Sequence, residues 1–272
     1  MKQASLVSGG PLSTPQASLR IFALGAVRAL AGPVHLDPLR ARAGRLLTLL
    51  ISLPDHSGIK EQVAERLWPD DFKALNNLHA AVRDLRVWLR DSASIESYGA
   101  DFRLKDAYVD ADELETLVQR ARQRRPAGDA EAARSYMEAV RLYRGPFFAQ
   151  YDFEWVTSRR SRIDHQATEA LIMMSEAALA RHEFLNAVEL ASRASAISPP
   201  REDALRVEMI ALCQLGRRSE ALIRYRDCEV YLRREVRCRP DPLTSRLEER
   251  LRHGDCPTIR EAQTEFLSAM TS

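Results

Sequence analysis

DFKALNNLHAAVRDLRVWLR, residues 71–90, has the apolar periodicity of one long helix. Its apolar side chains recur at alternating spacings of three and four residues and predict a single buried face, formed by Leu75, Leu78, Val82, Leu85 and Leu89. A second face repeats these spacings with side chains that reach base edges and phosphates from a major groove, namely Asn76, His79, Arg83, Arg86 and Arg90. On an isolated helix such a stripe more often marks a solvated face, so the interpretation depends on the flanking segments.

Short β-type runs and two helical segments precede this stretch. Residues 19–24, 26–30 and 34–36 predict strands, with turns at Gly25 and at Gly32-Pro33. Residues 38–54 predict a first helix that ends at Pro54, and residues 58–71 predict a second helix that ends at Pro69. The first helix adds three arginines that we expect to contact the DNA backbone if they point outward: Arg40, Arg42 and Arg45.

The segment after the long helix predicts a β-hairpin. SIESYGADFRLKDAYVDAD, residues 94–112, contains short alternating runs on either side of Tyr98-Gly99. Strands, three helices and a hairpin follow one another in the order of a winged helix-turn-helix domain, here residues 19–110, and the leading strands resemble the variant in OmpR-type response regulators. In such a domain the long helix enters the major groove, and the hairpin would bring Arg103 or Lys105 to neighbouring phosphates.

Composition excludes several other classes of protein. The 272 residues suffice for two domains, and the formal net charge of +2 means that any nucleic-acid surface must be local. No apolar run is long enough to span a membrane, and residues 1–18 predict a flexible polar leader. Four cysteines lack metal-binding spacing, so we expect reduced thiols, no metal and no cofactor in a cytoplasmic protein: Cys213, Cys228, Cys238 and Cys256.

Residues 111–252 predict an all-α array with an internal period. A shift of 34 residues places Ala187 on Ala221 and Ala194 on Cys228, so small residues recur where two helices must approach closely. This is the period of a tetratricopeptide repeat, and Pro199 fits its proline position, although the early Trp and Gly of that repeat are missing. Residues 112–142 predict one more such unit, with a turn at residues 126–129, and residues 253–272 form a C-terminal tail.

Two other features of the second half allow more than one interpretation. LYRGPFFAQYDFEW, residues 142–155, is rich in aromatic side chains and is either a partner-binding patch or, as we favour, a loop that fills the core of the array. Arg159, Arg160 and Arg162 cluster at one helix start and offer a site for a small-molecule or nucleotide effector, although an exposed basic turn is far more common.

Taken together, the two halves resemble the Streptomyces antibiotic regulatory proteins (SARP), in which an OmpR-type winged helix precedes a bacterial transcriptional activator domain (BTAD). The resemblance extends from Leu19 to Leu251 and depends on six motifs: LRIFALGAVRAL (19–30), RLLTLL (45–50), ERLWPDD (65–71), LYRGPFF (142–148), the helix start at 155–162 and GRRSEALIRYRDCEVYLRREVRCRPDP (216–242). It implies activation of transcription, binding of the winged helix to direct repeats in double-stranded DNA, contact with RNA polymerase and a side-by-side homodimer. Carried over by position, the resemblance places Asn76, His79, Arg83 and Arg86 against bases and phosphates.

Two departures from the family pattern support an alternative hypothesis. Leu75 and Asp84 stand where the family usually has basic residues, and Asp84 would repel a phosphate or accept from a cytosine amino group. The alternative is a tetratricopeptide-type scaffold, for protein interaction or ligand sensing, whose winged helix no longer binds DNA. An enzyme is the least supported class because the sequence has no phosphate-binding glycine loop, no nucleophile elbow and no metal-ligand cluster.

Overall fold

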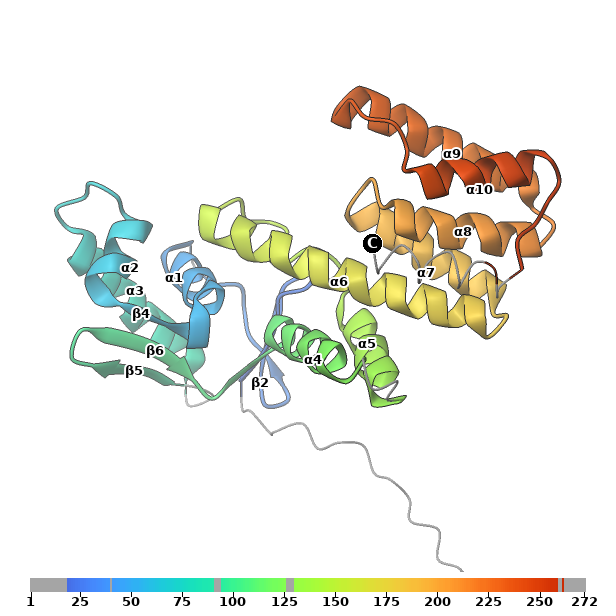
Figure 1. The fold of residues 1–272 in the computed structure, drawn as a ribbon. Coiled ribbons are helices and arrows are strands. Elements are labelled where there is room, and N and C mark those ends of the chain that lie inside the picture. The colour runs from blue at the N-terminus through green and yellow to red at the C-terminus, as the bar shows by residue number, and fades with distance from the viewer. Residues whose placement is uncertain (1–18, 40, 91–93, 126–129, 259–260, 262–272) are drawn as a thin grey trace, which may run out of the picture. The chain divides into compact units, whose positions relative to one another are not determined.

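The computed structural model describes residues 19–39, 41–90, 94–125, 130–258 and 261, which form two units (Figure 1). The first unit contains residues 19–22 and 27–109, and the second contains residues 23–26 and the chain from Asp110 onward. The predicted boundary follows residue 110, and the two units differ from it chiefly at Ala23–Ala26, because this segment forms hydrogen bonds within the second unit.

A four-stranded sheet opens the first unit. Its order is β3-β2-β1-β7, with β1 at Leu19–Phe22, β2 at Arg28–Ala31, β3 at Val34–His35 and β7 at Ala107–Val109. β1 pairs antiparallel with β2 and parallel with β7, so Leu19 lies opposite Ala31 on one side and Ala107 on the other. The sequence predicted the first three strands but not β7, because three residues are too few to show an alternating pattern.

Three helices build the core of the first unit: α1 (Ala41–Ser52), α2 (Lys60–Leu67) and α3 (Ala74–Leu89). Leu46, Leu67, Leu78 and Leu85 have no exposed surface, and α3 packs against both other helices. The predicted apolar face of α3 is therefore confirmed, with one exception. Leu75 is 43% exposed, and Ala74 takes its place on the buried face of the first turn.

The long helix starts three residues later than predicted. Asp71, the first residue of the predicted helix, precedes α3, and its carboxylate accepts hydrogen bonds from the Lys73 amide at 2.8 Å and from Asn77 Nδ2 at 2.9 Å. The backbone carbonyl of Asp71 accepts from the Ala74 amide. Because an aspartate side chain that bonds to a backbone amide two residues ahead stabilises a turn, residues 71–73 form a turn that leads into α3.

A second sheet forms the wing. β5 (Ser94–Tyr98) and β6 (Asp101–Lys105) make the predicted hairpin, in which Gly99 has a φ of +53°. Ile95 lies opposite Leu104, and both side chains are buried with Phe102, which fixes the face that the wing turns toward the helices. The short strand β4 (Ser57–Ile59) pairs with β6 and completes the order β4-β6-β5, a strand that the sequence did not predict.

The second unit is a succession of helices, each packed against the next. They are α4 (Asp110–Arg124), α5 (Ala130–Leu142), α6 (Glu154–Ala180), α7 (Phe184–Ile197), α8 (Glu202–Gln214), α9 (Arg218–Tyr231) and α10 (Pro242–Arg252), with a π-helical turn at Leu232–Val236. Ala187, Ala194 and Ala221 are fully buried, as the 34-residue period predicts for close helix contacts. The predicted turn at residues 126–129 and most of the tail from residue 259 lie outside the described residues. A small β-containing winged helix followed by a helical array confirms the predicted fold class.

Residues 23–26 belong to the second unit because its polar groups bind their backbone. The Asp110 carboxylate accepts from the Ala23 amide at 2.7 Å, and the Phe148 amide donates to the Ala23 carbonyl at 2.8 Å. Gly25 has a φ of +92° and donates to the Pro146 carbonyl. The aromatic loop thus bonds to this segment at residues 146–148, and the side chains of Phe147 and Phe148 are buried. This confirms the favoured interpretation, a loop that fills the core.

A half-buried acid on α6 should make stability depend on pH. Burial raises the pKa of Glu176 to about 7, while Arg125 and Arg206 partly oppose that shift. Since the pKa is higher in the folded state, the stabilisation that comes from the bound proton is full below the unfolded pKa and is lost as pH rises through about 7. The difference in the free energy of unfolding between the Glu176→Gln variant and the wild type should therefore depend on pH. We expect this difference to favour the variant by about 1–3 kcal/mol more at pH 8 than at pH 4. Urea unfolding at both pH values measures this difference, and equal effects at the two pH values would contradict the prediction.

Candidate nucleic-acid interface

One face of α3 is polar, basic and open to solvent. Asn76, His79, Arg83 and Arg86 are exposed on it, while the opposite face packs on α1 and α2. Arg90 is also exposed, but it follows the last residue of α3 and has a φ of +52°, so the predicted stripe does not continue to it along the helix. The Arg83 side chain is 76% exposed, and its nearest acid is Asp84, whose Oδ1 lies 3.9 Å from Arg83 Nε. Because a helix held rigidly by its apolar face presents the other face to a partner, α3 has the geometry of a recognition helix.

The wing is joined to this helix by a direct bond. Arg86 Nη2 donates to the Ile95 carbonyl on β5 at 2.9 Å, so Arg86 anchors the wing as well as carrying charge. On β6, Arg103 is exposed and has no ion-pair partner among the described residues. Lys105 instead forms an ion pair with Glu96 at 2.7 Å, which lowers its availability to a phosphate. Of the two predicted wing cations, Arg103 is the better placed.

The three arginines predicted to contact DNA from the first helix differ in their exposure to solvent. Arg42 is exposed at the start of α1 and could reach a phosphate. Arg45 is half-buried, and its Nε atom is inaccessible to solvent. Arg45 is therefore less available to a phosphate than Arg42. Arg40 lies outside the described residues.

Exposed apolar side chains that are not among the predicted interface residues border the basic stripe. Phe72 is 92% exposed in the turn before α3, and Val87 is 73% exposed in its last turns. With Leu75, they could contact thymine methyl groups, which are the apolar feature of the major groove. The sequence shows that these residues are close to the stripe along the chain. Their exposure depends on which face of α3 the core covers.

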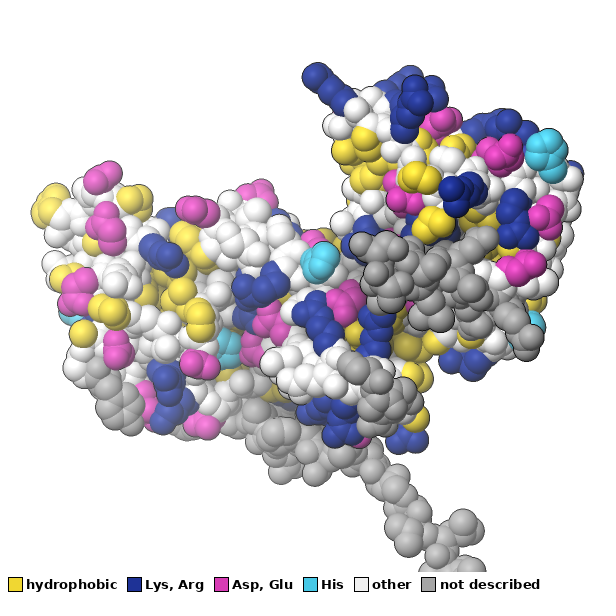
Figure 2. Space-filling view, in the orientation of Figure 1, with side chains coloured by type: hydrophobic (Ala, Val, Ile, Leu, Met, Phe, Trp, Pro, Cys, Tyr) yellow, Lys and Arg dark blue, Asp and Glu magenta, His cyan; other side chains and the backbone are white. Residues whose placement is uncertain are grey.

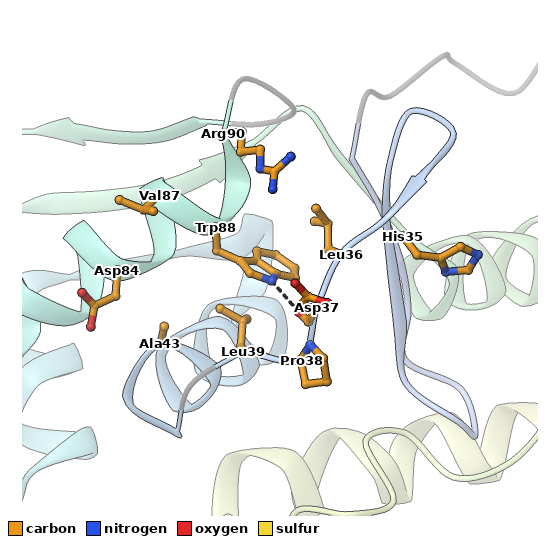
Figure 3. Close-up of a pocket in the computed structure, with 10 residues that line it drawn as sticks. All are labelled: His35, Leu36, Asp37, Pro38, Leu39, Ala43, Asp84, Val87, Trp88 and Arg90. Carbon is orange, nitrogen blue, oxygen red and sulfur yellow. Dashed lines mark hydrogen bonds between the residues drawn. The ribbon is translucent and has the colours of Figure 1, made fainter.

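A cavity of about 360 Å³ lies beside the C-terminal half of α3 (Figure 3). Figure 3 shows Asp84, Val87 and Trp88 of α3 on one side and Asp37-Pro38 of the connection before α1 on the other. Trp88 Nε1 donates to the Asp37 carbonyl at 2.7 Å. This bond ties the end of α3 to the connection that leads from the first sheet, and so helps to hold the helix in place.

The three arginines at the start of α6 are engaged within the second unit. Arg159 is buried and donates to Asp112 and Glu115, while its guanidinium lies 5.1 Å from the centre of the Phe147 ring. Arg160 donates to the carbonyl groups of the aromatic loop, and Arg162 Nε lies 3.0 Å from Glu115. An exposed basic turn is thus wrong for Arg159, and none of these contacts supports a nucleotide site here. The reason is that acidic residues of α4, distant in sequence, face this helix start.

On the face that Figure 2 shows, charges of both signs are interspersed. Figure 2 shows acidic and basic side chains side by side on the face in view of each unit, without a large field of one sign. Within the described ranges no group of three or more His, Cys, Asp or Glu residues is placed to hold a metal ion. In the same part of the chain, no helix combines the length and apolarity needed to cross a bilayer.

Comparison with known proteins identifies the family. Residues 109–252 match the model of the bacterial transcriptional activator domain, and the chain belongs to this family. The SARP/BTAD-type resemblance seen in the sequence is therefore confirmed.

Two curated relatives are regulatory proteins named AfsR. The chain is 27% identical over 249 residues to AfsR of Streptomyces griseus, and 26% identical over 260 residues to AfsR of Streptomyces coelicolor. These alignments cover 90% and 94% of this chain, whereas the chain spans about a quarter (26%) of the length of each AfsR.

A solved structure shares the fold. It is Mycobacterium tuberculosis EmbR in complex with a low-affinity phosphopeptide, with a TM-score of 0.74 and 18% sequence identity. The superposition covers 93% of this chain and 70% of that one. At this identity the likeness supports the succession of winged helix and helical array, and it carries no information about ligands.

Proposed function

We propose that this protein is a sequence-specific DNA-binding regulator that activates transcription. The observation that carries the proposal is the exposed stripe of α3, because its polar and basic side chains project from a helix whose other face is fixed in a core. Membership in the bacterial transcriptional activator family supports activation rather than repression. The helical unit would supply contact with RNA polymerase and the interface of a side-by-side homodimer.

In the proposed complex, α3 lies in the major groove. Asn76 has the amide that pairs bidentately with adenine, Arg83 has the guanidinium that pairs with guanine, and His79 lies between them on the stripe. The wing lies beside the C-terminal half of α3 through the bond between Arg86 and Ile95, so Arg103 would contact the phosphates that border the groove. Two protomers on a direct repeat would place two such helices about one turn, 10–10.5 base pairs, apart.

Selection from fragmented host DNA tests this function. The full chain should enrich a direct repeat, and its affinity for the best fragment should fall steeply between two salt concentrations, because neutralised phosphates release counterions. Purified RNA polymerase should then start more transcripts from that promoter when the protein is present. No enrichment and no binding at low salt would favour the scaffold hypothesis, in which the helical array acts without DNA.

The wing arginine should contribute affinity without specificity. We expect Arg103→Ala to weaken binding to all sequences by a similar factor and to reduce the slope of log affinity against log salt by about 1. Filter binding to the operator and to unrelated DNA at several salt concentrations measures both effects. Arg141→Ala, which removes an exposed arginine from α5, is the matched control and should change neither. A loss confined to the operator would show that Arg103 reads bases instead.

A further inference from the structure

The outer stripe of α9 combines apolar and basic side chains that remain exposed. Ile223, Arg226 and Val230 follow one another at spacings of three and four residues, and so share one side of the helix. Ile223 is 52% exposed and Val230 is 45% exposed, whereas Ala221 and Tyr225 are buried on the other side of α9. Figure 1 shows α9 at the edge of the helical unit, with α8 and α10 packed against its inner side.

Exposed apolar side chains are concentrated in this part of the chain. Of the twelve large apolar side chains that are exposed in the described residues, four lie between residues 223 and 236. The two that lie beyond the stripe are Tyr231, the last residue of α9, and Val236 in the π-helical turn that follows. Single exposed apolar side chains need no explanation, but a group of them marks an interaction surface.

The same segment carries an excess of positive charge. Residues 218–239 contain seven arginines and four acids, an excess of +3, whereas the whole chain of 272 residues has a net charge of +2. Two of the arginines pair with acids, Arg224 with Glu208 and Arg233 with Glu229. Asp227 borders the stripe and offsets one further charge. The other five arginines are exposed and have no ion-pair partner within the described ranges: Arg218, Arg226, Arg234, Arg237 and Arg239.

We propose that the outer stripe of α9, together with the π-helical turn, binds a segment of a partner protein, namely an amphipathic helix whose apolar face is bordered by acidic side chains. The apolar face would cover Ile223 and Val230, and the carboxylates would lie against Arg226, Arg234 and Arg237. DNA matches this surface less well, because phosphates would gain nothing from the apolar side chains between the arginines. The inference deepens the proposed contact of the helical unit with a transcription partner and rests on that proposed function, but the binding that it predicts needs no DNA.

The experiment measures the fluorescence anisotropy of a labelled synthetic peptide mixed with the full-length protein. The probe is a helical peptide with leucines at spacings of three and four residues and glutamates on both sides of them, and its counterpart has glutamine in place of every glutamate. We expect saturable binding of the acidic peptide and binding of the counterpart at least about tenfold weaker at low salt, a difference that added salt should reduce. Because no DNA is present, a failure of this inference is distinguishable from a failure of the regulatory function.

Matched variants assign the binding to α9. Ile223→Ser should weaken binding of the acidic peptide about tenfold, because it removes an apolar side chain that the peptide would bury. Leu185→Ser changes an apolar residue of α7 that is 67% exposed, and it should leave the affinity unchanged. Arg226→Glu should also weaken binding about tenfold at low salt, whereas Arg141→Glu, at an exposed arginine of α5, should not.

Three results with the peptide would overturn the proposal. They are no saturable binding by the wild type, equal binding of the glutamine counterpart, and full affinity in Ile223→Ser and Arg226→Glu proteins that circular dichroism shows to be folded. Competition with an unrelated DNA duplex tests the other class of partner. The peptide should stay bound, and its displacement by the duplex would assign this surface to phosphates and so contradict the proposal.

Discussion

Replacement of Arg83 by alanine should weaken operator binding by about tenfold to a hundredfold, because a bidentate pair with a base contributes about 1–3 kcal/mol of discrimination. The fold should tolerate this change. The Arg83 side chain is 76% exposed, and its ion pair with Asp84 is long at 3.9 Å, so the free energy of unfolding should change by no more than about 0.5 kcal/mol. Affinity for the selected operator and for a variant with one base pair changed, measured at fixed salt, gives the effect and its specificity.

Controls separate the roles of the arginines on α3. Arg83→Lys keeps the charge but not the planar fork, so it should restore non-specific affinity more than specificity. Arg86→Ala also removes the bond to the Ile95 carbonyl, and its effect therefore mixes lost charge with a loosened wing. A double alanine variant at Arg83 and Arg86 that retained normal operator affinity would be incompatible with recognition through α3.

Phe147→Ala should lower the free energy of unfolding of the second unit by about 3–5 kcal/mol, the usual cost of deleting a buried aromatic ring. The Phe147 ring has no exposed surface, lies 4.7 Å from the Phe148 ring centre to centre, and lies under the Arg159 guanidinium. Its loss would leave a cavity where the aromatic loop meets α6. Hydrogen exchange of the α6 amides measures the stability of this region directly.

Phe72→Ala is the matched control because it removes the same ring from a site that is 92% exposed. It should change the free energy of unfolding by less than about 0.5 kcal/mol. The contrary outcome is that Phe147→Ala changes the free energy of unfolding as little as Phe72→Ala does and yet abolishes the protein's activation of transcription. In that case the aromatic loop would be a partner-binding patch, and its packing role would be secondary.

The predictions for Arg83 and Phe147 concern an exposed side chain and a buried one. On α3 the polar face is open because the core needs only the other side of the helix, and a regulator needs that open face for DNA. At the start of α6, Arg159 forms ion pairs with two acids of α4 and lies over the Phe147 ring. Contacts within the second unit therefore occupy the arginine that the sequence offered for a ligand.

Local pattern determined much of this protein. The buried face of α3, the hairpin at Tyr98-Gly99 and the helices of the second half follow from periodicities within about twenty residues, and each was predictable from the chain alone. The polar stripe of α3 belongs to this group, since residues at spacings of three and four share a face whatever surrounds the helix.

The tertiary structure alone decided which short segments pair as strands and which side chains are buried or exposed. β4 and β7 are strands only because β6 and β1 lie beside them, and no three-residue run reveals its partner. Arg159 is buried because Asp112, 47 residues earlier, meets it across α4 and α6. Leu75 is exposed because it lies on a side of α3 that the core does not cover, and Phe72 is exposed in the turn before α3. Exposure and pairing depend on residues that are distant in sequence, so they are set by packing rather than by local pattern.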